Sequence, residues 1–402
     1  MKPLYRKIHS HFKLNGISLS HDELKEVAYS LIKEGETFEK EIGDFLLDWL
    51  DDSPTLQVHS SGSTGKPKPI MLQKRHMVNS ALATGEFFGL LPGDTALLCL
   101  PATYIAGKMM LVRAMVIGLE LDYVTPSSNP LDGIPNKTYT FGAMVPLQLE
   151  NSLHDLDRIN ILIVGGAPLS RKVQSQVQDR ARPPERQGQK VQIQAQARST
   201  EQELTARNFS TAIFETYGMT ETITHIALKK LNFRLSDPTG QGRSTVDAQV
   251  HNPSFKTLPN VRLSTDERGC LVIVAPTITD APVVTNDVVE LISKTEFNWI
   301  GRFDNVVNSG GVKLFPEQIE AKLATVIPYR FFVAGIPDEA LGQKLVLVME
   351  GEIEEKQLFQ EIKLLKPLNK FEVPKEIFTV SEFQQTQSGK IKRGETLKTI
   401  FP

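Results

Sequence analysis

The sequence has little that would direct the chain to a membrane, to nucleic acid or to secretion. Its formal net charge is only −2 over 402 residues, which gives no electrostatic attraction to nucleic acid or to anionic lipid. No run approaches the roughly 20 apolar residues of a membrane-spanning helix. The basic N-terminal stretch, MKPLYRKIHSHFKLNG, lacks the apolar centre of a signal peptide. We therefore expect a cytoplasmic protein with no nucleic-acid partner and no membrane insertion.

Cysteine is also scarce. Cys99 and Cys270 are far apart, and each lies in an apolar run. Free cysteines of this kind are usually buried and inert, so we expect both to be reduced core residues. The sequence has no Cys/His cluster at the spacing of a zinc site.

The distribution of apolar residues indicates the fold class. Residues 20–50 contain two successive segments in which apolar residues recur with the helical period, which predicts two helices. Ser20 is a plausible N-cap of the first helix. From residue 56, short apolar runs such as LQVHS, TALLCLP and INILIV alternate with helical stretches. This alternation predicts a layered α/β domain with much parallel sheet. Ligands of such sheets bind beyond the carboxyl ends of the strands, where LQVHS and INILIV both lead into glycine-containing loops.

The second part of the chain changes in character. Residues 179–208 are rich in Arg, Gln, Glu and Pro, which predicts a mobile surface insertion, with a partly helical excursion as the alternative. The chain is β-rich from residue 255, and about 100 residues after Gly301 show the pattern of a small α+β domain. We expect a large domain at 1–303, shortened at its N-terminus, and a mobile domain at 304–402.

The segment HSSGSTGKPK at residues 59–68 has the chemistry of a phosphate-binding loop. Glycines let backbone N–H groups approach an anion, and hydroxyls and lysines add donors and charge. The alternative is a solvated turn. A Walker loop is excluded, because Gly62 precedes Gly65 by only three positions and Pro67 follows Lys66.

Further segments carry polar residues in an informative order: ETYGMTET, VVTNDVVEL, GRFDNVVNSGGVKLFPEQIE and QTQSGKIKRGE. Taken singly, they could be a capped turn, a turn aspartate, a polar linker and a basic tail. With the phosphate loop and GGAPL, they resemble the motifs of the adenylate-forming ANL superfamily, over residues 60–393. That superfamily includes acyl-CoA synthetases, adenylation domains of peptide synthetases and luciferases. TND stands where the family has a TGD-like triplet.

The resemblance implies a role for each matching residue. Lys390, Thr220 and Glu221 would be catalytic: Lys390 bridges carboxylate and α-phosphate, Thr220 contacts the α-phosphate, and Glu221 holds Mg²⁺. The implied ATP-binding residues are Ser60, Ser61, Gly62, Ser63, Thr64, Gly65, Lys66 and Lys68 at the phosphates, Gly166, Ala167, Tyr217 and Gly218 around the adenine, and Asp287 and Arg302 at the ribose. Asp304 would be a hinge for the small domain, and Ser309, Gly310 and Gly311 would line a tunnel for the thiol of CoA.

The resemblance also narrows the choice of the acid substrate. The phosphate loop begins only 60 residues from the start, and such a shortened chain most resembles the o-succinylbenzoate–CoA ligases of menaquinone biosynthesis. Tyr104, which stands where relatives often have His, and Gly165 would line the acid site. Lys108 and Arg113 could meet a second substrate carboxylate, but five residues on a helix place them about 140° apart, and we favour Lys108. His76 is a weaker candidate.

Alternatives to this substrate remain open. They are another aryl or fatty acid, a carrier protein in place of CoA, and a silent nucleotide-binding protein. Intact Lys390, Glu221 and Asp287 argue against the silent protein. A homodimer is compatible with the sequence.

Overall fold

The computed structural model describes residues 4–59, 69–134, 137–167, 169–181, 211–232, 254–351, 354–386 and 391–401. These residues form two compact units. Unit 1 comprises residues 1–58, 70–260 and 277–280, and unit 2 comprises residues 59–69, 261–276 and 281–402. The phosphate loop from Ser60 to Lys68, Lys390 and the expected insertion from residue 182 onward lie outside the described residues. No helix in the described ranges is long and apolar enough to cross a bilayer.

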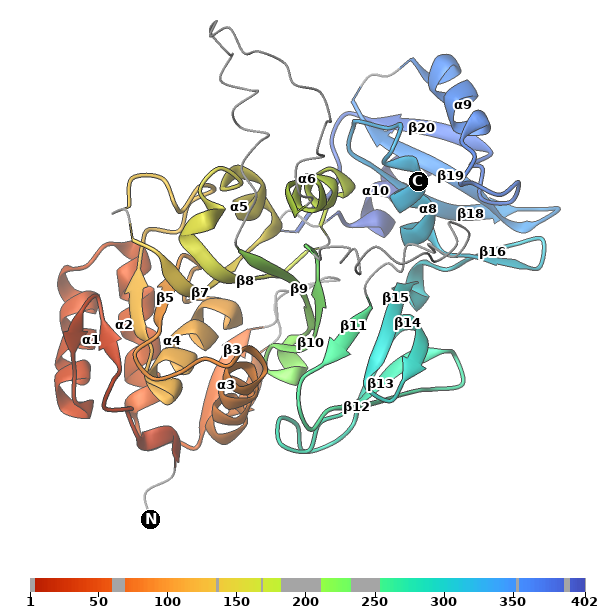
Figure 1. Ribbon diagram of the computed structural model, residues 1–402. Helices are drawn as coiled ribbons and strands as arrows, with labels where there is room; N and C mark the ends of the chain where they lie inside the picture. Colours follow the sequence, from red (N-terminus) through yellow and green to blue (C-terminus); the bar gives the residue numbers. More distant parts are fainter. Residues whose placement is uncertain are drawn as a thin grey trace, which may run out of the picture. The chain divides into compact units, whose positions relative to one another are not determined.

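The two N-terminal helices of unit 1 form as the sequence predicts. They are α1 (His21–Glu34) and α2 (Thr37–Leu50), which lie side by side (Figure 1). Ser20 begins α1 with a capping box: its Oγ accepts from the N–H of Glu23 at 3.4 Å, and Glu23 Oε2 accepts from the N–H of Ser20 at 2.8 Å. Because the backbone N–H groups of Ser20 and Glu23 both have a hydrogen-bond acceptor, α1 begins at a defined residue.

The main sheet of unit 1 confirms the predicted α/β class. Neighbouring strands run in the order β11-β10-β9-β8-β7-β5-β6-β1-β2, and the pairs from β9 to β1 are parallel. The strands are β1 (Lys13–Leu14), β2 (Ile17–Ser18), β5 (Thr95–Leu98), β6 (Glu120–Tyr123), β7 (Tyr139–Met144), β8 (Ile159–Val164), β9 (Ala212–Gly218), β10 (His225–Lys230) and β11 (Phe255–Thr257).

Helices between the strands complete this unit. They are α3 (Lys74–Phe88), α4 (Ile105–Ile117), α5 (Pro146–Asn151) and α6 (Arg171–Ala181), with short 3-10 turns η1 (Leu4–Arg6), η2 (Leu156–Arg158) and η3 (Thr220–Thr222). A buried cluster joins strands β5, β7 and β8 to helices α5 and α6 through Leu97, Tyr139, Leu162, Leu149 and Val173. Cys99 belongs to this cluster and is free, as predicted.

The strand before the phosphate loop is placed differently from our expectation. That strand is β3 (Thr55–His59), and it pairs with β4 (Pro69–Gln73) in a separate two-stranded sheet. The prediction that LQVHS belongs to the parallel sheet is therefore wrong. A parallel neighbour requires a crossover of a dozen or more residues, whereas residues 60–68 connect β3 directly to β4.

Unit 2 begins with antiparallel strands in the order β12 (Arg262–Thr265), β13 (Cys270–Val274), β14 (Val283–Ser293) and β15 (Glu296–Arg302). The turn η4 (Phe303–Asn305) follows. Cys270 is buried and free. The unit boundary at residues 260–261 lies well before the expected domain boundary at Phe303–Asp304, which falls inside unit 2. A hinge at Asp304 stays a prediction.

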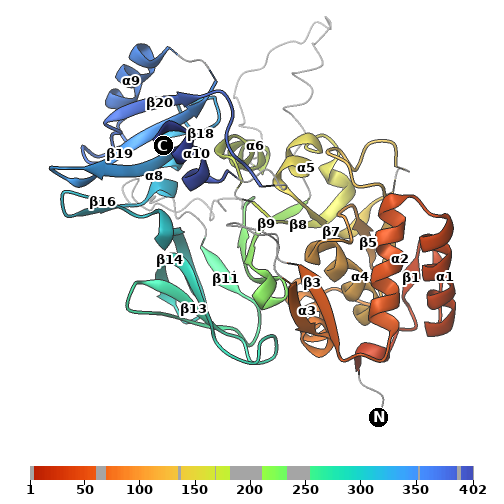
Figure 2. The ribbon, with the colours of Figure 1, turned by 180° about the vertical axis from the view of Figure 1, so that it is seen from behind.

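The tail of unit 2 has the predicted α+β pattern (Figure 2). Its sheet has the order β17-β16-β19-β18, with β20 parallel to β19. The elements are β16 (Val307–Ser309), β17 (Val312–Leu314), α8 (Pro316–Leu323), β18 (Phe331–Asp338), β19 (Gly342–Glu350), α9 (Glu355–Leu364), β20 (Glu376–Val380) and α10 (Arg393–Ile400). Alternate residues of β18 and β19 pack against α8 and α9 on one face and α10 on the other, as the two-residue period of a strand requires.

Candidate active site

In unit 1, two predicted site segments meet at one edge of the sheet. Strands β8 and β9 are parallel, with Val164 opposite Glu215, so the turn after each strand emerges at the same edge. Gly165 follows β8 beneath the Thr216 side chain, where an added Cβ would collide with the hydroxyl. Gly166 has φ +89°, a conformation suited to glycine. The structure thus brings the GGAPL turn beside the YGMTET turn.

The YGMTET turn presents Thr220 and Glu221 on η3. Thr220 is partly buried and Glu221 is exposed. The ring of Tyr217 lies 5.8 Å from that of Phe255, centroid to centroid. Gly218 has no room for a side chain, because an added Cβ would lie 2.1 Å from the Thr224 carbonyl oxygen and 2.5 Å from His225 Cα. The turn therefore exposes the carboxylate of Glu221, while the backbone around Gly218 is tightly packed.

A buried arginine lies within unit 1. Arg113, on α4, is 1% exposed. Its NH2 is 3.5 Å from His225 Nδ1, its NH1 is 3.8 Å from Met110 Sδ, and its Nε has no partner among the described residues. Burial lowers the pKa of Arg113 to about 9, with no carboxylate opposing the shift. Among the described residues, no carboxylate compensates the charge of this guanidinium.

The neighbour of this arginine is the histidine that follows the YGMTET turn. His225 is 3% exposed, and its Nε2 is 3.4 Å from Thr84 Oγ1. Burial, followed by the charge of Arg113, lowers the pKa of His225 well below its usual value. A neutral imidazole therefore faces the guanidinium. Sequence reasoning missed His225, because only its burial beside Arg113 distinguishes it from an ordinary strand residue.

Lys108 has a different environment from Arg113. Its Nζ lies 5.0 Å from the ring centroid of Phe45 on α2. Burial lowers the pKa of Lys108, while Asp48, Glu41 and Asp44, all on α2, oppose that shift. Arg113 and Lys108 thus meet different neighbours, as their predicted separation around the helix requires. Lys108 already has acidic groups near it.

Two further candidates from the sequence are Tyr104, expected at the acid site, and His76, the weaker candidate. Tyr104 precedes α4 and is 46% exposed. His76 is 6% exposed, and its Nε2 lies 3.5 Å from Asp280 Oδ1. Burial lowers the pKa of His76, against the carboxylate of Asp280. The contact between His76 and Asp280 joins the segment that contains Asp280 to α3.

Unit 2 brings together the residues expected at the ribose and at the hinge. Asp287 on β14 pairs in register with Arg302 on β15, and Arg302 NH1 lies 3.8 Å from Asp287 Oδ1. Arg302 NH2 donates to Asp304 Oδ2 at 3.1 Å. Asn286 Nδ2, which the sequence analysis did not assign, donates to the same carboxylate at 3.2 Å. Arg268 in turn donates to Asn286 Oδ1 at 2.9 Å.

The expected thiol-tunnel residues form a hairpin turn. Ser309 ends β16 and pairs with Val312 of β17. Gly310 and Gly311 connect them with φ of +56° and +82°, as a two-residue hairpin turn with two positive φ angles demands. The structure therefore accounts for both glycines by turn geometry, and their contact with a thiol stays a prediction.

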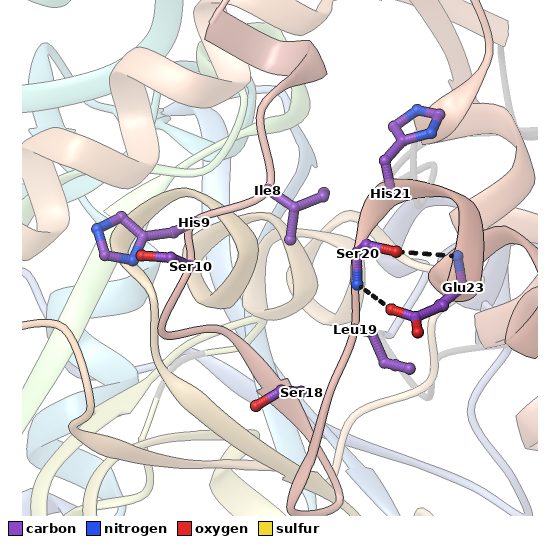
Figure 3. A pocket seen from close by; sticks show the side chains of 8 residues that line it. All are labelled: Ile8, His9, Ser10, Ser18, Leu19, Ser20, His21 and Glu23. Atoms are coloured by element: carbon purple, nitrogen blue, oxygen red, sulfur yellow. Dashed lines mark hydrogen bonds between the residues drawn. The ribbon is translucent and has the colours of Figure 1, made fainter.

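Unit 1 also has a surface hollow, and it is lined by residues other than the expected site residues. Figure 3 shows its lining, drawn from the N-terminal segment, β2 and the start of α1, with Ser20 and Glu23 joined by the capping-box bonds. None of the expected site residues lines it. We assign it no function.

Comparisons with known proteins agree with the motifs. Residues 19–189 match the family model described as AMP-binding enzyme. A 2-succinylbenzoate–CoA ligase of Staphylococcus aureus (strain JH9) is 26% identical over 366 residues, covering 86% of this chain and 67% of that protein. The chain thus spans about two thirds of the length of this curated relative.

Solved structures show the same fold. The O-succinylbenzoate coenzyme A synthetase from Bacillus subtilis, in complex with ATP and magnesium ion, is 18% identical with a TM-score of 0.65, covering 94% of this chain and 82% of that one. An acyl-CoA synthetase (AMP-forming)/AMP-acid ligase II-like protein from Dyadobacter fermentans is 34% identical with a TM-score of 0.55, covering 94% of this chain and 98% of that one. The chain therefore belongs to the AMP-binding enzymes, and it is an AMP-forming acyl-CoA ligase.

Proposed function

We propose that this enzyme joins o-succinylbenzoate to CoA in menaquinone biosynthesis, in two steps through an acyl-adenylate. The observation that carries the choice of acid is the buried, uncompensated guanidinium of Arg113. o-Succinylbenzoate has two carboxylates: one is activated, and the other needs a cation. The curated relative in Staphylococcus aureus, which is named for this acid, supports the same choice.

Arg113 suits the second carboxylate better than Lys108 does. A buried cation without an anionic partner is costly, and an anionic ligand removes that cost. A guanidinium can also bind a carboxylate through two parallel hydrogen bonds. Lys108 already lies near Asp48 and two other carboxylates of α2, which would repel an anionic substrate. We therefore assign the substrate contact to Arg113, in place of the Lys108 that we favoured from the sequence.

The remaining residues would bind ATP and magnesium. We assign the phosphates to Ser60–Lys68, the α-phosphate to Thr220, and the ribose to Asp287 and Arg302. Glu221 would hold Mg²⁺. Its single exposed carboxylate fits that ion, which usually binds one or two carboxylates together with substrate phosphates and waters. The described residues contain no group of three or more acidic, His or Cys side chains that could hold a metal ion by themselves.

The proposed chemistry explains the choice of residues. Attack of a carboxylate on the α-phosphate brings two anions together, and Lys390 would reduce their repulsion and stabilise the charge that develops. The donor of Thr220 would orient the α-phosphate. After pyrophosphate leaves, rotation about Asp304 would withdraw Lys390 and admit the thiol along Ser309–Gly311. The adenylate would then react with CoA to give the thioester and AMP.

The experiment is acid-dependent pyrophosphate release. We would compare o-succinylbenzoate with 4-oxo-4-phenylbutanoate, which lacks the ring carboxylate, and with fatty acids of several lengths. We expect o-succinylbenzoate to give the highest kcat/KM. A higher value for the analogue or for a fatty acid would refute the assignment of the acid, although not the ligase class.

The acceptor needs its own comparison. The alternative is a carrier protein whose phosphopantetheine receives the acyl group, since both acceptors present the same thiol. Thioester formation with free CoA at saturating acid supports our proposal. Release of pyrophosphate without transfer to CoA, together with transfer to a carrier, would support the alternative.

A further inference from the structure

Ile223, two residues after Glu221, is the central residue of an unusual three-residue turn from Thr222 to Thr224. Ile223 has φ +65° and ψ −59°, and the N–H of Thr224 donates to the carbonyl of Thr222 at 2.7 Å. This is the rare, strained form of γ-turn. A β-branched residue at positive φ is an outlier, and Ile223 is 2% exposed. Such strain persists only where the surroundings hold it in place.

The hydroxyl of Thr222 supplies that restraint. Thr222 is fully buried. Its Oγ1 accepts from the N–H of Met219 at 3.0 Å. The same Oγ1 lies 2.8 Å from the carbonyl oxygen of Thr224 and 3.0 Å from that of Met219, so it can donate its proton to either one. One side chain thus ties together the residues on both sides of Thr220 and Glu221.

We infer that Thr222 is a positioning residue for adenylate formation, whose hydroxyl holds the strained turn that presents Thr220 and Glu221. This inference rests on the proposed roles of those two residues. Without the hydroxyl, Ile223 can relax to negative φ. The carboxylate of Glu221 would then lose its fixed direction toward the metal, and the hydroxyl of Thr220 its direction toward the α-phosphate.

The test is the Mg²⁺ dependence of pyrophosphate release in Thr222→Val, which keeps the shape and removes the hydroxyl. Losing a residue that orients a metal ligand weakens metal affinity by about 10–100-fold, so we expect the half-maximal Mg²⁺ concentration to rise by that factor. Thr222→Ser should restore it. Thr222→Ala is the second variant without a hydroxyl, in case Thr222→Val does not fold.

The matched control is Thr211→Val. Thr211 directly precedes β9 and is 1% exposed, and its hydroxyl donates to the Leu156 carbonyl. Thr211→Val should reduce stability without changing the Mg²⁺ dependence. Unchanged Mg²⁺ dependence in Thr222→Val and Thr222→Ala, alongside a weakened Glu221→Gln, would overturn the inference alone. Unchanged dependence in Glu221→Gln would overturn the role of Glu221 as well.

Discussion

Replacing Arg113 by methionine should make the protein more stable and less active. Burial lowers the pKa of Arg113 from 12.5 to about 9. Since one pKa unit corresponds to about 1.4 kcal/mol, the folded state disfavours the charged form by about 5 kcal/mol. Apolar replacement of buried ionic groups has stabilised other proteins by about 1–4 kcal/mol. We expect Arg113→Met to raise the free energy of unfolding within that range, as measured by urea denaturation without substrate.

The same substitution should impair use of the dicarboxylate. Removing one partner of a buried charge pair costs about 2–5 kcal/mol, which corresponds to a fall in kcat/KM of about 30-fold to several thousand-fold for o-succinylbenzoate. The analogue without the ring carboxylate has no such contact to lose. Its kcat/KM should therefore change little.

Two variants serve as controls. Arg113→Lys keeps the charge and loses the planar fork, so it should recover only part of the activity. Lys108→Met removes the neighbouring cation of α4 and should leave the preference between the two acids unchanged. Equal losses for both acids in Arg113→Met, or a loss of stability without substrate, would refute our explanation of this residue.

Other predictions concern protonation and the two half-reactions. The folded-state pKa of His225 lies below the usual 6.5, so the unfolded chain binds the extra proton and stability falls as pH drops below 6.5. In urea titrations at pH 7.5 and 5.5, His225→Asn should show less of this decline, and an equal decline would contradict the assignment. Burial raises the pKa of Glu320 to about 7, despite Arg393. The folded state therefore holds an extra proton between pH 4.5 and 7, and stability should fall as pH rises through that window, except in Glu320→Gln. Finally, Lys390→Ala should abolish adenylate formation and spare thiolation of supplied acyl-adenylate; if both half-reactions survived intact, the two-step account would be wrong.

The parts of the fold set by local pattern could be predicted from the sequence. Helices α1 and α2 follow from apolar periodicity, and the Ser20 cap from the spacing of Ser and Glu. The alternation of short apolar runs with helical stretches predicted the α/β class. The pairing of β3 with β4 was not predicted, because an isolated apolar run does not reveal which strand it will join.

The candidate site was predictable as a set of motifs, but its supporting contacts were not. Helix α4 is buried nearly all round, so apolar periodicity could not tell which of Lys108 and Arg113 meets acidic neighbours. The burial of His225 and the strained φ of Ile223 depend on tertiary packing. Asn286 offered one signal: it departs from the family's TGD-like triplet, and in the structure it contacts Asp304.

The central claim is that this chain makes the CoA thioester of o-succinylbenzoate through an adenylate. The most direct measurement is mass spectrometry of the products formed from o-succinylbenzoate, ATP, Mg²⁺ and CoA. We predict the thioester, AMP and pyrophosphate in equal amounts. Conversion of a monocarboxylic acid under the same conditions, with no thioester from o-succinylbenzoate, would contradict the account.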